Sequence, residues 1–318
     1  MIRTEGWNGR CRQASAALLV VGLTLNFGLG CAETPAGVGA GGGGAAAVAE
    51  APRSSQPAIA MASAEPKHLI EARALLKEIQ SAGPDRNSYQ HKNITVVWPA
   101  GPAGADRAVP SELHADCSGF LNLLVAHACG LSADQILKRF GRARPLAKTW
   151  YAMISAQFGF EEIRRVQDIR PGDFIAIQYP PGGENTGHCM LAAGVATQRK
   201  ATKPLLADST QWEVTVIDSS MSPHGSTDTR NRPAAGEAAN AGATAAADKP
   251  AHATGLGQGI LRLYADKDGK IVGYSWSVLG GSDLHLQADH ALVVGRGLFD
   301  VLPKGTVPAA AGDEGAHD

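Results

Sequence analysis

The hydrophobic period of this chain changes once along its length, and that change limits the folds open to it. In the first part, apolar residues recur at helical spacing, which predicts four helices at 69–79, 116–126, 132–140 and 144–157. Later, short alternating runs bounded by turn residues predict strands at 173–179, 188–195, 212–217, 259–265, 271–276 and 291–294. Helices followed by strands are typical of an α+β fold whose sheet is antiparallel.

The N-terminus has the layout of a secretory signal peptide. Three arginines precede an apolar run at 14–25. That run is about a dozen residues long, which is shorter than the roughly 20 residues that a membrane-spanning helix needs. We therefore expect the protein to be exported.

The end of this segment, Gly28-Leu29-Gly30-Cys31, resembles a bacterial lipobox. The resemblance implies a lipoprotein signal peptide at 1–31, lipid on Cys31 and a place on the periplasmic face of the outer membrane. Ordinary cleavage after Ala32, which would give a secreted or periplasmic protein, stays open, as does an uncleaved anchor. Contact with the membrane is expected only through the anchor.

Low-complexity stretches divide the rest of the chain. Residues 32–65 are rich in Ala and Gly and predict a flexible tether. One folded domain is expected at 66–303, with a disordered insertion at about 225–254 and a disordered tail at 304–318. The formal net charge of the whole chain is -1 and its basic residues are dispersed, which argues against a nucleic-acid partner.

Cys117 is the strongest candidate for chemistry. It follows Asp116, a helix-capping residue type, at the start of a predicted helix. A thiol at that position faces the unpaired N–H groups and the positive end of the helix dipole, which favour the thiolate. The position therefore predicts a nucleophile.

His188 and Asp218 are the candidate partners of this thiol. His188 opens one predicted strand and Asp218 ends another. If the two strands pair with these faces aligned, the carboxylate reaches the imidazole. The chain would then hold a nucleophile, a base and an orienting acid in the order Cys, His, Asp.

Two motifs resemble the NlpC-type cell-wall cysteine peptidases. Asp116-Cys117-Ser118-Gly119-Phe120 looks like the nucleophile motif of that family, and Arg170-Pro171-Gly172-Asp173 with Gly187-His188 looks like its Gly-Asp and Gly-His motifs. The resemblance covers residues 117–220. Neither Tyr89 nor Trp98 has the spacing of the tyrosine that the family carries upstream of its nucleophile.

The resemblance implies a papain-like fold and an enzyme that cuts peptide or amide bonds of cell-wall stem peptides. No metal or organic cofactor is implied. Asp116, Ser118 and Thr186 are candidates for binding substrate or stabilising the oxyanion, and the Cys117 backbone N–H is a further oxyanion donor. The alternative function is an acyltransferase or a catalytically idle envelope-binding module on the same fold.

Each candidate also has a plainer interpretation. Cysteines are often small buried residues, a histidine can be structural, and Asp218 can be a turn residue. His114 and His224 are rival bases, and Cys129 with Cys189 is a possible disulfide. A zinc site would need both faces of one strand, because Cys189 and His188 are adjacent. The glycine-rich run at 255–259 precedes a strand and is not a nucleotide-binding loop.

Overall fold

The computed structural model describes residues 64–99, 109–183, 185–231 and 253–299, all within one compact unit, Ala60–Asp318. The expected signal peptide, Cys31, the tether as far as residue 63 and the tail at 304–318 lie outside the described residues. So does the middle of the expected insertion, at 232–252.

Four helices form where the helical periodicity predicts them. They are α1 (Lys67–Ala82), α2 (Cys117–Cys129), α3 (Ala133–Phe140) and α4 (Ala147–Ser155). A capping box of Ser132 and Gln135 begins α3, since each side chain accepts a hydrogen bond from the backbone N–H of the other residue. Both α2 and α3 end at a glycine in the left-handed region, Gly130 and Gly141, which terminates the helix.

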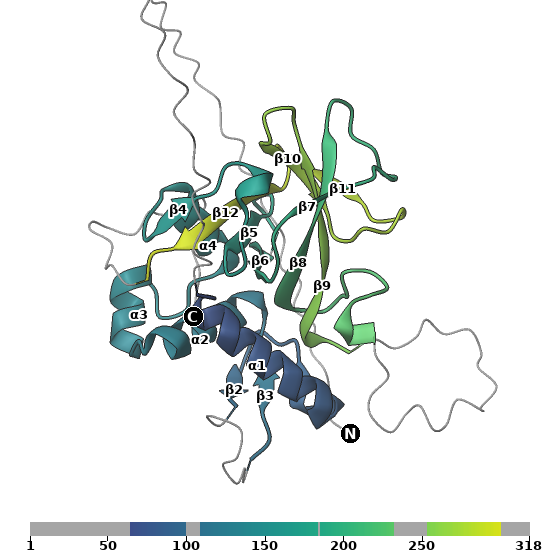
Figure 1. The fold of residues 1–318 in the computed structure, drawn as a ribbon. Helices are drawn as coiled ribbons and strands as arrows, with labels where there is room; N and C mark the ends of the chain where they lie inside the picture. Colours follow the sequence, from purple (N-terminus) through teal and green to yellow (C-terminus); the bar gives the residue numbers. More distant parts are fainter. Residues whose placement is uncertain (1–63, 100–108, 184, 232–252, 300–318) are drawn as a thin grey trace, which may run out of the picture. The chain divides into compact units, whose positions relative to one another are not determined.

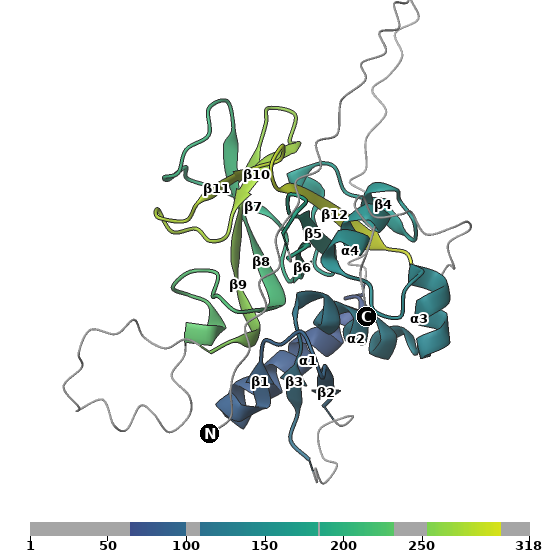
Figure 2. The same cartoon turned by 180° about the vertical axis from the view of Figure 1, so that it is seen from behind.

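A small three-stranded sheet lies between α1 and α2 in the chain. Its strands are β1 (Asn87–Ser88), β2 (Thr95–Val97) and β3 (Glu112–His114), with β3 in the middle. A short 3-10 helix, η1 (Pro84–Arg86), leads into β1. Figure 2 shows this sheet beside α1. Only the segment at 94–98 has a strand-like sequence, so the sheet itself was not predicted.

The large sheet holds nine strands, and every pairing within it is antiparallel. The order is β11-β10-β9-β8-β6-β5-β12-β4, with β7 added beside β8 (Figure 1). The helices and this sheet confirm the predicted α+β class. The strands run as β4 (Phe160–Glu162), β5 (Phe174–Gln178), β6 (Gly187–Ala192), β7 (Thr197–Arg199), β8 (Thr210–Ser220), β9 (Gly255–Ala265), β10 (Ile271–Ser275), β11 (Leu284–Leu286) and β12 (Ala291–Gly297).

Both faces of the central strands are buried. Along β6, Cys189 and Leu191 belong to the core on the helical side, while Met190 and Ala192 belong to a second core. Helix α4 packs on β5, β6 and β12, and α2 packs on β6 and β8. The start of α2 therefore lies against the two strands that carry the candidate base and acid.

Backbone hydrogen bonds order the segments that follow β8 and β9. Residues 266–269 form the turn of the β9–β10 hairpin, where the N–H of Gly269 donates to the carbonyl of Asp266. The disordered insertion expected from 225 was wrong at its start, because residues 225–231 are described and include a short 3-10 helix, η3 (Thr229–Asn231). Arg230, in that helix, is 2% exposed.

No single helix among the described residues is long and apolar enough to cross a membrane. Helices α2 and α3 meet that test only when taken together, and they are bent by 115° with respect to each other.

Candidate active site

Cys117 is the first residue of α2, and Asp116 caps that helix. The Asp116 carboxylate accepts hydrogen bonds from the Gly119 N–H at 2.6 Å and the Ser118 hydroxyl at 3.1 Å. Arg144 also donates to it, at 2.5 Å. Because the cap is held by both backbone and an ion pair, the sulfur of Cys117 has a fixed place at the positive end of α2.

A second contact fixes the start of α2 against the sheet. The hydroxyl of Ser219, in β8, donates to the carbonyl oxygen of Ala115 at 2.6 Å, and Ser219 is fully buried. Asp218, the neighbour of Ser219 in β8, is fully buried as well. Strand β8 therefore fixes the backbone just before Cys117 and also carries the candidate acid.

His188 and Asp218 make the contact that strand pairing predicted. Strand β6 pairs with β8, and His188 Nε2 lies 2.7 Å from Asp218 Oδ2. A carboxylate only accepts, so Nε2 carries the proton. That assignment leaves Nδ1 of the imidazole for Cys117, whose charge contributes to raising the pKa of His188.

The charges of Cys117 and His188 stabilise each other. Burial alone would lower the pKa of His188, but the negative Cys117 and the hydrogen bond to Asp218 raise it to about 10. The pKa of Cys117 is well below its usual value, first through a hydrogen bond with Cys189 and then, against the effect of burial, through the His188 charge. The pair is a thiolate beside an imidazolium at neutral pH.

Cys189 was not predicted to contact Cys117. It is fully buried, and its interaction with Cys117 is the largest cause of the low pKa of that thiol. Burial, followed by that contact with Cys117, raises the pKa of Cys189 well above its usual value. Cys189 therefore keeps its proton and donates it toward Cys117, which makes it a support of the thiolate rather than a second nucleophile.

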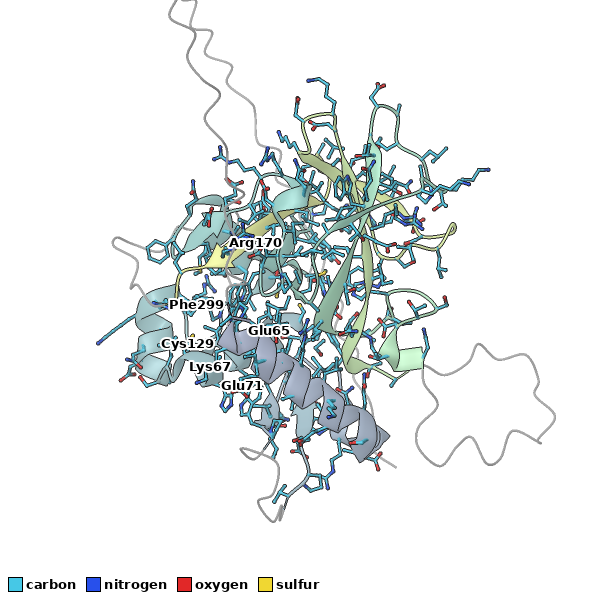
Figure 3. The ribbon with its side chains drawn as sticks, viewed as in Figure 1. Glu65, Lys67, Glu71, Cys129, Arg170 and Phe299 are labelled. Atoms are coloured by element: carbon cyan, nitrogen blue, oxygen red, sulfur yellow. The ribbon has the colours of Figure 1, made fainter. Side chains whose placement is uncertain are left out.

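The proposed disulfide between Cys129 and Cys189 was wrong. Both cysteines are free, and so is Cys117. Cys129 is the last residue of α2, and the helix rise over twelve residues separates it from Cys117 by about 18 Å. Figure 3 shows Cys129 beside the beginning of α1, where His127 lies 3.6 Å from Glu71.

Behind Asp218 lies a buried network that sequence reasoning did not find. Arg230 Nη2 donates to Asp218 Oδ1 at 2.7 Å and to Asp228 Oδ2 at 2.9 Å. Burial would raise the pKa of Asp218, yet the charge of Arg230, assisted by His224 and His188, holds it well below its usual value. Asp218 is therefore a permanent anion behind the imidazole.

His224 contacts the same carboxylate from another side. Its Nε2 lies 3.1 Å from Asp218 Oδ2, and its Nδ1 lies 2.7 Å from the carbonyl oxygen of Trp276. His224 thus connects the Asp218 carboxylate to the backbone at Trp276. The ring also stacks on Trp276 with centroids 4.0 Å apart.

Two glycines of β9 make room for this network. A Cβ atom at Gly257 would lie 2.5 Å from Arg230 Nε, and one at Gly259 would lie 2.5 Å from Asp228 Oδ2. The alternating glycines at 255–259 thus allow buried side chains to approach the strand backbone. This run of glycines is the sequence feature that could have indicated buried side chains packed against the β9 backbone.

A pocket of about 310 Å³ opens beside His188. Its described wall is mostly aromatic and includes Tyr89, which the sequence could not place. Burial, followed by the charges of Cys117 and Asp116, raises the pKa of Tyr89. The remaining lining residues are Tyr179, Asn185, Ser220, Met221, Ser222, Tyr274, Trp276, His285 and His290. Cys117 is not among them and is 5% exposed.

The other predicted site residues lie elsewhere. Ser118 is part of the α2 cap, and neither it nor Asp116 lines the pocket. Thr186 accepts a backbone hydrogen bond from Tyr179. Of the rival bases, His114 pairs with the Ser88 hydroxyl at 2.7 Å, and His224 lies behind Asp218. Among the described residues, no group of three or more His, Cys, Asp or Glu is arranged to hold a metal ion.

Comparison with known proteins gives one relative and no function. No family model matches the chain, and no solved structure matches it. The uncharacterized protein R653 of Acanthamoeba polyphaga mimivirus is 36% identical over 245 residues, which cover 74% of this chain and 98% of the viral protein. At that identity and coverage, this chain belongs to the same family as the uncharacterized mimivirus protein R653.

Proposed function

We propose that this protein is a cysteine hydrolase of peptide or amide bonds. The observation that carries the proposal is the contact of His188 with the buried Asp218, together with the lowered pKa of Cys117, to which the His188 charge contributes. A thiolate at a helix start, beside an imidazolium that a carboxylate orients, is the arrangement needed for nucleophilic attack on a carbonyl.

Each residue has one role in the proposed reaction. The Cys117 sulfur attacks the carbonyl carbon, and the oxyanion forms near the Cys117 N–H at the start of α2. The C–N bond breaks as His188 gives its proton to the leaving amine, which leaves a thioester on Cys117. His188 then takes a proton from water, whose oxygen attacks the thioester and releases the carboxylic acid and the thiolate.

Asp218 orients the ring throughout and stabilises the imidazolium. Arg230 keeps Asp218 ionised, and Cys189 donates toward the thiolate between turnovers. Both act through another residue, so we assign them as positioning residues.

The NlpC-type resemblance extends the proposal to fold and substrate. An α+β unit with the nucleophile at a helix start against an antiparallel sheet is compatible with the papain-like arrangement that the resemblance implies. It makes cell-wall stem peptides the first natural substrates to test. Export and lipid on Cys31 remain part of the same proposal, and both lie outside the described residues.

A second candidate function follows from the low exposure of the thiol. Cys117 is 5% exposed and does not line the pocket. The same residues could bind a peptide or carry an acyl group without hydrolysing it if water could not reach the Cys117 sulfur. An acyltransferase or an idle envelope-binding module is therefore the alternative.

Incubation of the full chain with purified peptidoglycan and with model peptide amides, followed by mass analysis, separates these functions. Wild-type protein should release new carboxyl ends, and Cys117→Ala and His188→Ala should not. Circular dichroism must show that both variants keep their fold. Release by Cys117→Ala at the wild-type rate would refute the thiol mechanism. Transfer of an acyl group to an added amine, without the free acid, would establish the acyltransferase instead.

A further inference from the structure

The wall of the pocket beside His188 contains rings and few charges. Six aromatic or imidazole side chains other than His188 line it, and no Asp, Glu, Lys or Arg is among the described lining residues. The polar groups that remain are the neutral side chains of Asn185, Ser220 and Ser222. The charged group beside the pocket, the His188 imidazolium, is already compensated by Cys117 and Asp218.

Contacts among the rings fix the wall. Tyr274 stacks on His285 with centroids 4.9 Å apart, and His285 meets His290 at 4.6 Å. Trp276, two residues after Tyr274, packs against His188 with ring centroids 4.8 Å apart. Rings held by one another lose little freedom when a ligand binds, so the pocket is preformed.

His285 does not add a positive charge to the wall at neutral pH. Burial, followed by the charge that His290 would carry, lowers the pKa of His285, and Asp283 opposes this shift. A neutral His285 offers a ring face and no fixed charge to a ligand. An acidic side chain entering this space would lose its hydration, and the His188 imidazolium in the lining is already compensated by Cys117 and Asp218.

We infer that this pocket binds a residue flanking the scissile bond and selects an uncharged aromatic or aliphatic side chain there. The inference rests on the proposed function and names the substrate class of the same site. A volume of about 310 Å³ accommodates a residue or two and not a long polymer. Exposed Met221, in the same wall, adds an apolar thioether surface.

The test uses internally quenched peptides that are identical except for one position, which is Phe, Leu, Glu or Lys. One series varies the residue before the scissile bond, and another varies the residue after it. With the full chain, kcat/KM for Phe or Leu should exceed that for Glu or Lys by about tenfold or more in one series. Equal rates, or a preference for Glu or Lys in both series, would overturn the inference while leaving a hydrolase in place.

Binding provides a readout that does not depend on turnover. The Cys117→Ala full chain should bind the Phe or Leu peptide at least about tenfold more tightly than the Glu or Lys peptide, followed by tryptophan fluorescence because Trp276 lines the pocket. If no peptide is cleaved by the wild type but this order holds, the hydrolase proposal fails and the pocket assignment stands. If Glu or Lys peptides bind as well as Phe, the pocket assignment fails.

A charge introduced into the wall gives a matched pair of variants. His290→Glu places a carboxylate in the pocket and should shift preference toward the Lys peptide, with weaker binding of Phe. Ala288→Glu adds the same charge two residues away, at an exposed position outside the lining, and should keep the wild-type order. If both variants change the peptide preference equally, His290 does not contact the ligand, and the inference is overturned.

Discussion

Arg230 Nη2 lies 2.7 Å from Asp218 Oδ1, the carboxylate oxygen that neither His188 nor His224 contacts. Both groups are almost completely buried. The guanidinium therefore balances the charge that orients the candidate base, and the site depends on a residue from the connection between β8 and β9.

Arg230→Ala should strongly destabilise the protein. It leaves the buried carboxylates of Asp218 and Asp228 without their cation, which costs about 3–5 kcal/mol in comparable cases. The free energy of unfolding from urea titration measures this loss. Arg165→Ala, which breaks an exposed pair with Asp168, should leave that free energy nearly unchanged. Equal losses in both variants would contradict the assigned role.

Gly257→Ala should disturb the site without touching the pocket. Its new Cβ would lie 2.5 Å from Arg230 Nε, so the guanidinium or the strand must shift. We expect a loss of about 1–3 kcal/mol in the free energy of unfolding and slower turnover. Gly281→Ala is the control, because no atom lies within 4 Å of its added Cβ. A fully active and stable Gly257→Ala variant would show that Arg230 is not confined there.

The pH dependence of Cys117 alkylation should differ from that of a free thiol. The pKa of Cys117 is lowered, so its thiolate is already formed at neutral pH, and His188 stays protonated up to its pKa of about 10. The iodoacetamide rate should therefore change little between neutral pH and about pH 9, whereas an ordinary thiol gains reactivity near its pKa of about 8.5. Peptide mass analysis assigns the label. A profile that rises only above about pH 8 would rule out the ion pair.

Cys189→Ala should make Cys117 less acidic. The variant removes the hydrogen bond that contributes most to the low pKa of Cys117. The alkylation profile should move to higher pH, and the rate near pH 6 should fall several-fold. Cys129→Ala, at the other end of α2, should leave the profile in place. If both variants match the wild type, Cys189 does not stabilise the thiolate.

Local sequence signals predicted the parts of the site that local structure positions. Asp116 caps α2 as its residue type indicated, and β6 and β8 pair so that His188 reaches Asp218. The helices and six of the strands followed from periodicity. The strands that were not predicted in the large sheet, β4, β7 and β11, have three residues each, too few to show a period.

The rest of the site depends on contacts between distant residues. Arg230 and Asp228 precede an Ala/Gly-rich stretch whose composition favours disorder, and only the folded sheet gives them a buried partner. Alternation placed Cys189 on the face opposite His188, which is correct for a strand. It gave no means of knowing that Cys117 would contact both residues, since that depends on how α2 packs on the beginning of β6.

The hydrogen bond from Ser219 to Ala115 spans 104 positions and connects the start of α2 to a strand made much later in the chain. A growing or partly folded chain lacks that closure, and long-range closures of this kind must first overcome their loop entropy. We therefore expect Cys117 to react as an ordinary thiol until β8 is in place. Under the proposed function, the rate of Cys117 alkylation would then report when folding is complete.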